Sequence, residues 1–116
     1  MLNALLPGTV VPVHRHPYSN ETVFQLSGKL AEVMYEEVEV PAGTDGADSL
    51  SQTDGNMLMF NGRCMRESGR FLLDPSAGDF GCVVPAGVWH TVEVLAPSVL
   101  FEAKDGKYGV DGSESL

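Results

Sequence analysis

Basic residues are scarce in this sequence. Seven Lys and Arg face sixteen Asp and Glu, which gives a formal net charge of -9 over 116 residues. Nucleic acid and anionic membrane faces are bound by basic patches, so the charge balance argues against both as partners. Long apolar runs are also missing, and the longest, such as residues 95–101, are too short and interrupted to span a bilayer.

Cysteine is nearly absent as well. Cys64 and Cys82 stand alone without a C-x-x-C motif, which gives no support for a disulfide framework. Cys82 lies in an apolar run, where a small core residue is favoured over a catalytic thiol. The apolar start of the chain lacks a basic n-region and a small-residue cleavage site, so we expect a cytoplasmic protein.

No run of ten or more residues has helical periodicity. The length suits one domain, and Gly, Pro, Asp, Asn or Ser separate short runs rich in β-branched and apolar residues. Ser27-Gly28-Lys29 predicts a hairpin turn between two of them. The sequence therefore predicts an all-β sandwich or barrel. The expected strands are 10–16, 22–26, 30–35, 57–60, 70–73, 80–84, 91–95 and 99–103.

Two segments are poor in bulky apolar residues and rich in Gly, Asp and Ser. Residues 41–56 predict a long surface loop, and residues 106–116 predict a flexible C-terminal tail. The barrel is therefore expected to span residues 1–105. No internal repeat or interdomain linker is visible.

The sequence holds only three histidines, and their positions suit one metal site. His14 and His16 are two residues apart, so a strand would place both imidazoles on one face, roughly 6–7 Å apart along the chain. Glu21 follows after a short turn, on the next strand, and His90 follows a Pro-x-Gly turn from which it could close the site from across the barrel. Three imidazoles and one carboxylate form a first shell for a divalent transition metal.

Each part of this pattern is weak alone. Paired histidines on strands are often surface residues, and one histidine after Pro-x-Gly means less still, but their joint occurrence is much stronger. Four protein ligands leave positions open on a five- or six-coordinate ion, as a catalytic or ligand-binding metal requires. The donor set does not identify the metal, since iron, manganese, nickel, copper and zinc all accept imidazole and carboxylate.

The spacing of these residues resembles the cupin motifs. Gly8, five residues, His14-x-His16, four residues, Glu21, six residues and Gly28 look like the first motif. Gly78, six residues, Pro85-x-Gly87, two residues and His90 resemble the second with one extra residue, although Val94 stands where that motif usually closes with Asn. The wider context is similar to the WbuC family of cupin-fold metalloproteins, on the stretches 1–9, 14–17, 85–91 and 99–108.

This resemblance implies a single cupin domain, a double-stranded β-helix of jelly-roll type, often a homodimer. It implies one metal ion held by His14, His16, Glu21 and His90, and it suggests a sugar or sugar-nucleotide ligand from polysaccharide synthesis. It does not imply a reaction. Members of that family carry an N-terminal extension before the barrel, whereas this sequence starts almost at the first expected strand, so either the start is misassigned or this is a shortened form. The stretch between the motifs, residues 29–77, is also longer than expected.

Further residues could line the ligand site. Alternation from Glu21 turns Val23 and Gln25 inward and Phe24 outward; Gln25 would orient a ligand or serve as a hydrogen-bonded structural residue. Tyr18 could lie at the rim. The same count from His90 turns Val92 and Val94 inward and Glu93 outward. Lys104, which shares a face with Glu102, is either a ligand contact or part of a surface pair.

Two other groups have simpler interpretations. Trp89 should point away from the metal and act as a core or dimer-interface anchor. Arg63, Arg66 and Arg70 lie on a segment expected to be a loop, where they could attract an anionic substrate or be ordinary solvated residues.

The leading hypothesis is a metal-dependent cupin enzyme acting on a small oxygenated molecule. A second is a metal-containing binding or sensing module without chemistry, and a third is a metal-free epimerase-like or structural jelly roll. Metal uptake separates the third from the others, and recovery of an unchanged ligand separates the second from the first.

Overall fold

The computed structural model describes residues 1–40, 51–52, 57–60, 62–105 and 112–116. Most of them lie in antiparallel strands, and one short 3-10 helix, η1 (Pro75–Ala77), is also present. No helix in those ranges is long and apolar enough to cross a membrane. The strands are β1 (Leu2–Leu5), β2 (His14–Arg15), β3 (Glu21–Val38), β4 (Ser51–Gln52), β5 (Met57–Phe60), β6 (Arg63–Leu73), β7 (Gly81–Val84), β8 (Trp89–Lys104) and β9 (Glu114–Ser115).

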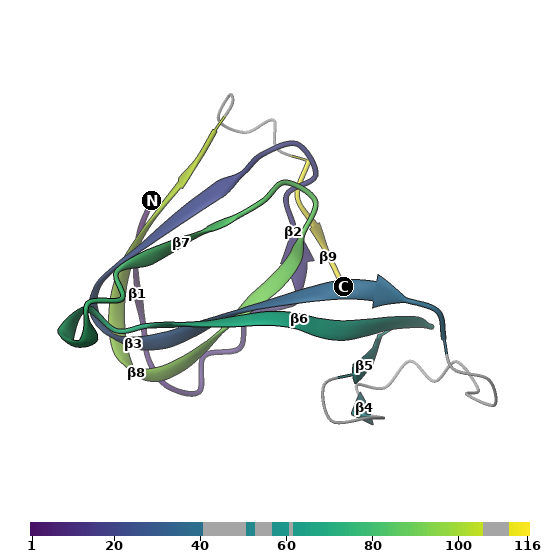
Figure 1. The fold of residues 1–116 in the computed structure, drawn as a ribbon, viewed down its shortest axis with the longest axis horizontal. Helices are drawn as coiled ribbons and strands as arrows, with labels where there is room; N and C mark the ends of the chain where they lie inside the picture. Colours follow the sequence, from purple (N-terminus) through teal and green to yellow (C-terminus); the bar gives the residue numbers. More distant parts are fainter. Residues whose placement is uncertain (41–50, 53–56, 61, 106–111) are drawn as a thin grey trace.

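These strands form one curled sheet. Its order is β4-β5-β6-β3-β8-β2-β9, and β1 and β7 pair with β8 and β3 outside that path. Figure 1 shows the sheet bending back over itself, so that the two halves of β3 and β8 face each other across the interior. The prediction of an all-β chain is therefore confirmed, in the form of a half-barrel.

The two central strands are longer than predicted. The sequence suggested two strands joined by a hairpin at residues 27–29. Instead, β3 continues through this segment as one bent strand whose two halves do not pair with each other, so the hairpin prediction is wrong. Likewise, residues 91–95 and 99–103 belong to one strand, β8. Toward the N-terminus the prediction was too long, because only His14 and Arg15 of residues 10–16 form a strand.

The bend in β3 lies where the hairpin was expected. The register between β3 and β8 shifts between Gln25 and Leu30, and Gly28 has a φ of 90°. The Ser98 hydroxyl accepts a hydrogen bond from the Lys29 amide and donates to the Ala96 carbonyl. The turn-forming residues thus make an irregularity that bends a continuous strand, as β-bulges do.

The interior next to this bend is apolar. Val23, Leu30, Leu73 and Leu100 form a buried cluster, against which Cys82 packs. Burial, with help from Glu32 and Glu21, raises the pKa of the Cys82 thiol to about 12. Because a protonated thiol is a poor nucleophile, this agrees with the interpretation of Cys82 as a packing residue.

A second buried cluster contains Trp89 with Val13 and Met65. The indole is 4 % exposed, and the guanidinium groups of Arg15 and Arg63 lie 4.5 Å and 5.0 Å from its centroid. Trp89 is therefore the core anchor that the sequence suggested, with cation–π contacts in addition.

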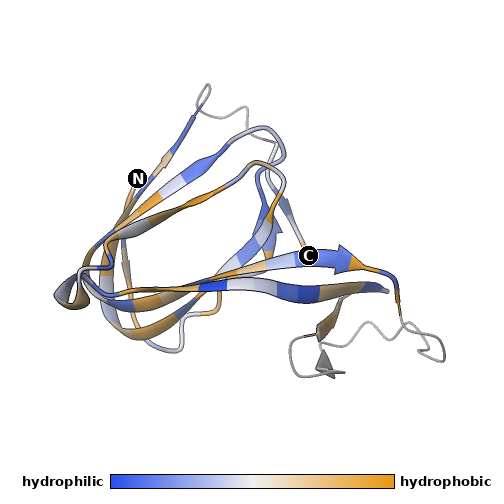
Figure 2. Ribbon diagram, viewed as in Figure 1, coloured by the Kyte–Doolittle hydropathy of each residue, from blue (hydrophilic) through white to orange (hydrophobic). Residues whose placement is uncertain are grey.

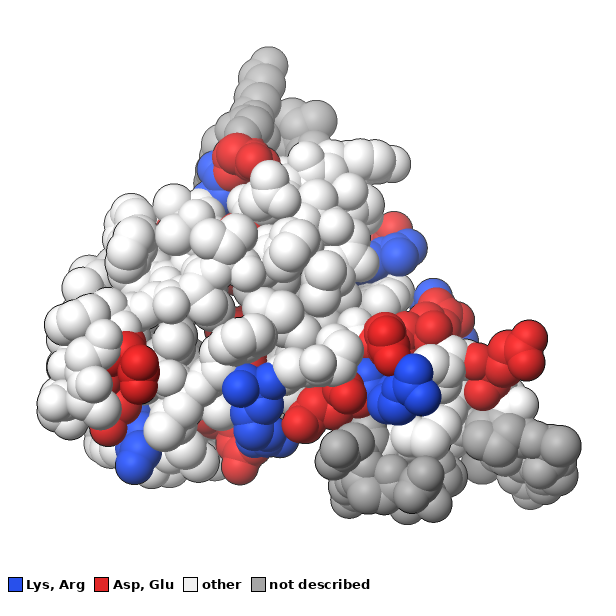
Figure 3. Space-filling model, viewed as in Figure 1, with Lys and Arg blue, Asp and Glu red and all other residues white. Residues whose placement is uncertain are grey.

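The three arginines that were expected on a loop lie on β6 or at its start. Arg63 pairs with Glu37, Arg66 with Glu36, and Arg70 with both Glu67 and Glu93. In Figure 2 this end of β3 and β6 is hydrophilic, and Figure 3 shows acidic and basic groups interleaved along the lower side. These arginines are occupied by carboxylates, which does not favour their use as an anion-binding patch.

The two segments predicted to be irregular are only partly described. Residues 41–50 and 53–56 of the predicted 41–56 loop lie outside the described residues, whereas 51–52 form β4. Residues 106–111 of the predicted tail also lie outside them. The end of that tail is a strand, because β9 pairs with β2 and Leu116 packs against the Trp89 cluster.

Candidate metal centre

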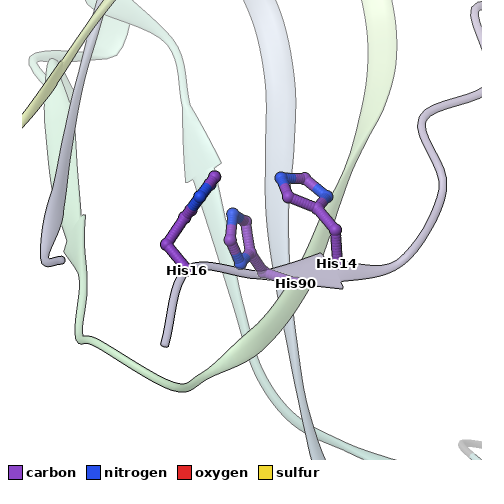
Figure 4. A group of neighbouring side chains, drawn as sticks. All are labelled: His14, His16 and His90. Carbon is purple, nitrogen blue, oxygen red and sulfur yellow. The ribbon is translucent and has the colours of Figure 1, made fainter. Parts of the chain in front are cut away.

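The three histidines meet inside the curl of the sheet. His14 on β2 lies directly opposite His90 on β8 in the strand register, so His90 is a cross-strand neighbour rather than a residue reaching across a barrel. His16 follows β2 by one residue. The imidazole centroids are 4.2 Å apart for His14–His90, 5.2 Å for His14–His16 and 5.5 Å for His16–His90. Figure 4 shows the three rings side by side, His14 on β2, His90 on β8 and His16 on the segment just after β2.

Each imidazole is oriented by a hydrogen bond at Nδ1. The partners are the Pro12 carbonyl for His14, 2.8 Å away, and the Val88 carbonyl for His90, 2.9 Å away. The hydroxyl of Ser113 is 2.8 Å from Nδ1 of His16. A carbonyl can only accept, so Nδ1 of His14 and of His90 carries the proton and Nε2 keeps its lone pair in the neutral ring. Metal-binding histidines are typically held in this way.

Ser113 therefore connects the C-terminal segment to the site. We expect Ser113→Ala to weaken binding of Zn²⁺ or Mn²⁺ about tenfold, because the His16 ring loses an orienting contact. Isothermal titration of the metal-stripped protein would measure this. Ser115→Ala is the matched control, since Ser115 is exposed on the neighbouring β9; equal affinities for the two variants would show that the contact does not matter.

Glu21 supplies a carboxylate to the same centre. Its Oε2 lies 3.1 Å from Nε2 of His16, and its Oε1 lies 3.6 Å from Nε2 of His90. Glu21 is 4 % exposed and His90 1 % exposed. The carboxylate thus lies beside the Nε2 atoms of two imidazoles. These nitrogens remain available to a ligand because the other ring nitrogen, Nδ1, is already hydrogen-bonded.

The electrostatics favour neutral imidazole at one ligand and a charged carboxylate at another. Burial lowers the pKa of His14, and the neighbouring His90 and His16 lower it further. Burial alone would raise the pKa of Glu21, but contacts with His90, His16 and Lys104 outweigh it and the net shift is downward. Burial likewise opposes the charged form of His90, yet Glu21, the Val88 carbonyl and Glu32 raise the pKa of that imidazole overall. Neutral imidazole and ionised carboxylate are the forms that bind metal.

A second carboxyl group, Glu32, was not anticipated from the sequence. It is 1 % exposed, and its oxygen lies within 4.8 Å of ligand atoms of Glu21 and His90. Burial, increased by Glu21 and Glu102, raises the pKa of Glu32 to about 8, although His90 acts in the opposite direction. The available signal was a single acidic residue inside the apolar run 30–34.

The predicted ligand contacts differ in their surroundings. Gln25 is 2 % exposed; its amide nitrogen donates to the Ser27 carbonyl, while its buried Oε1 has no hydrogen-bond partner among the described residues. Tyr18 is 80 % exposed. Lys104 is exposed and lies opposite Glu21 in the β3–β8 register. Gln25 is therefore the one of these three that is buried in the interior.

The lumen faces predicted by alternation are confirmed. Val23 and Val94 are buried, Val92 is partly buried against the apolar cluster, and Phe24 and Glu93 are exposed. The site thus combines a few polar groups with apolar walls. Two overlapping groups could hold a metal ion: His14, His16 and His90, and Glu21, Glu32 and His90.

One family matches part of the chain. Residues 1–41 match the family described as "Domain of unknown function (DUF6016)". The matched region contains His14, His16, Glu21 and Glu32, but it ends well before His90. No curated protein matches the chain.

Proposed function

We propose that this protein is a mononuclear metal-binding cupin, with a divalent transition metal held by His14, His16, Glu21 and His90. The observation that carries this proposal is the set of Nδ1 contacts, which orients three buried or half-buried imidazoles that lie together, two of them beside the Glu21 carboxylate. Histidines that serve only as core residues have no reason to gather in this way, with the Nε2 atoms of His16 and His90 beside a shared carboxylate. Iron, manganese, nickel, zinc and copper all suit this donor set.

We further propose that the site acts on a small oxygenated molecule, with sugars and sugar nucleotides as first candidates. The bound ion would supply Lewis-acid polarisation of a carbonyl or hydroxyl oxygen. The residues around it would exclude water and strengthen electrostatic interactions, because Val23, Val92 and Val94 provide apolar walls. Gln25 would orient the ligand through its buried amide oxygen. The homodimer and the cytoplasmic location remain predictions.

Metal analysis tests the proposal directly. The protein purified without added metal should contain close to one equivalent of transition metal, and His90→Ala should lower metal affinity at least a hundredfold, since His90 is common to both ligand groups. Val92→Ala is a matched control on the same strand, because it also shortens a side chain of the interior but removes no donor atom. Metal content below about a tenth of an equivalent, unchanged by His90→Ala, would reject the proposal.

A thermal-shift screen of the metal-loaded protein with sugars, sugar nucleotides and small acids would then identify the ligand. Analysis of the recovered ligand distinguishes the two forms of the proposal. A changed ligand indicates an enzyme, whereas a stabilising ligand recovered intact indicates a binding or sensing module.

A further inference from the structure

The metal-binding interior contains one more carboxyl group than the cupin resemblance requires. Glu32 lies within 4.8 Å of Glu21 and His90, and its Oε2 has no hydrogen-bond partner among the described residues. Its cross-strand neighbour on β8 is the apolar Val92. Glu32 is thus almost completely buried, faces two residues of the metal centre, and has an oxygen left without a partner.

A buried carboxylate without a partner is strongly unfavourable. The charged groups that act on Glu32 are His90, Glu21 and Glu102, and two of these are carboxyls that repel it. A cation at the centre would reverse this situation, because it attracts the carboxylate and supplies the missing contact. A positive charge next to Glu21 and His90 would therefore allow Glu32 to be ionised in this position.

Charge balance leads to the same conclusion. A divalent ion with three neutral imidazoles and Glu21 alone leaves one positive charge in an apolar interior. A second carboxylate makes the complex neutral, which a low-dielectric environment favours. A second oxygen donor also shifts the site toward ions that prefer oxygen, such as manganese, and away from softer ones.

We propose that Glu32 is a second carboxylate ligand of the cation bound by His14, His16, Glu21 and His90. This inference rests on the proposed function, since it concerns the same ion. It predicts that metal affinity and ligand number both depend on Glu32. Glu102 provides the comparison, because it is a neighbouring, partly buried carboxyl that belongs to neither ligand group and accepts a hydrogen bond from Asn3 instead.

The test uses the full chain, stripped of metal and titrated with Mn²⁺ and with Co²⁺. Glu32→Gln keeps the size of the side chain and removes its charge, and Glu102→Gln is the matched control. We expect Glu32→Gln to weaken Mn²⁺ binding tenfold or more and to change the visible d–d absorption of bound Co²⁺, which responds to the number and type of ligands. Glu102→Gln should alter neither by a comparable amount.

The outcomes separate this inference from the proposed function. If the wild-type protein binds one equivalent of metal and Glu32→Gln binds it equally well, Glu32 is not a ligand but the metal centre stands. Weaker binding with an unchanged Co²⁺ spectrum would mean that Glu32 acts through its charge only, and would also overturn the inference. If the wild-type protein binds neither ion, the proposed function and this inference fail together.

Discussion

In the metal-free protein, Glu32→Gln is expected to raise the free energy of unfolding above that of the wild type. This gain should be about 3–5 kcal/mol larger at pH 8 than at pH 4. In the folded protein burial raises the pKa of Glu32 to about 8, from an ordinary value of 4.5. Below pH 4.5 this group is protonated in both the folded and the unfolded chain, so it does not affect stability there. Between the two values only the unfolded chain ionises, and the folded state loses about 1.4 kcal/mol per pH unit. Glutamine does not titrate and removes this loss.

Urea denaturation in the presence of a chelator, from pH 4 to pH 8, would measure the effect as the difference between wild type and variant. Groups distant from Glu32 titrate alike in both proteins and cancel in that difference, whereas His90, whose pKa Glu32 helps to raise, contributes to it. Glu39→Gln is the control, since it removes one exposed carboxylate. If the stability curves of wild type and Glu32→Gln stay parallel, Glu32 does not carry the burial cost that its surroundings indicate.

Saturating metal should reduce this effect, by about 1.4 kcal/mol for each tenfold difference in metal affinity. If Glu32 is a ligand, the wild-type protein gains more stability from bound metal than Glu32→Gln does, because a ligand stabilises the folded state in proportion to the logarithm of its affinity. A burial cost that bound metal offsets would explain why this carboxyl group occupies the interior.

The histidine site could be predicted because it depends on local spacing. Residues at i and i+2 of an extended segment point to the same side, which brings the His14 and His16 rings to 5.2 Å although β2 ends at Arg15. The same alternation correctly placed Val23 and Gln25 inside and Phe24 outside. What the spacing could not provide was the cross-strand register. His90 pairs with His14 because β8 lies between β2 and β3, and this order depends on the whole sheet.

Glu32 was missed for a related reason. Alternation of side chains from Glu21 places Gln25 and the following odd-numbered residues on the inner face. By that pattern Glu32 would point outward. The register shifts between Gln25 and Leu30 reverse the alternation of side chains, so that Leu30 joins Val23 in the core and Glu32 lies close to Glu21. A single irregularity moves every following side chain to the opposite face.

That irregularity is also where sequence reasoning mistook a bend for a turn. Glycine after serine is typical of a hairpin, and nothing within the segment distinguishes a hairpin from a bulge. The distinction comes from a partner about seventy residues away along the chain: Ser98 on β8, whose hydroxyl accepts a hydrogen bond from the Lys29 amide.

Gly28→Ala is expected to destabilise the protein by about 3 kcal/mol or more, and this tests the role of the bend. The backbone of Gly28 has a φ of 90°, and an added Cβ would lie 2.1 Å from the Pro97 carbonyl oxygen and 2.7 Å from the Ser98 Cα. Both contacts involve backbone atoms, so β3 and β8 would have to move apart at this point of their pairing. Metal binding should weaken together with this loss of stability, because the bend determines which face of β3 the Glu32 side chain occupies.

Gly8→Ala is the matched control for that substitution. Gly8 has nearly the same φ, 89°, but an added Cβ there meets nothing within 4 Å. The strained φ should cost about 1–2 kcal/mol in both variants, and the excess for Gly28→Ala measures the close approach of the two strands. Equal losses of stability in chemical denaturation would mean that the strands can separate at little cost, and that the bend does not depend on glycine at this position.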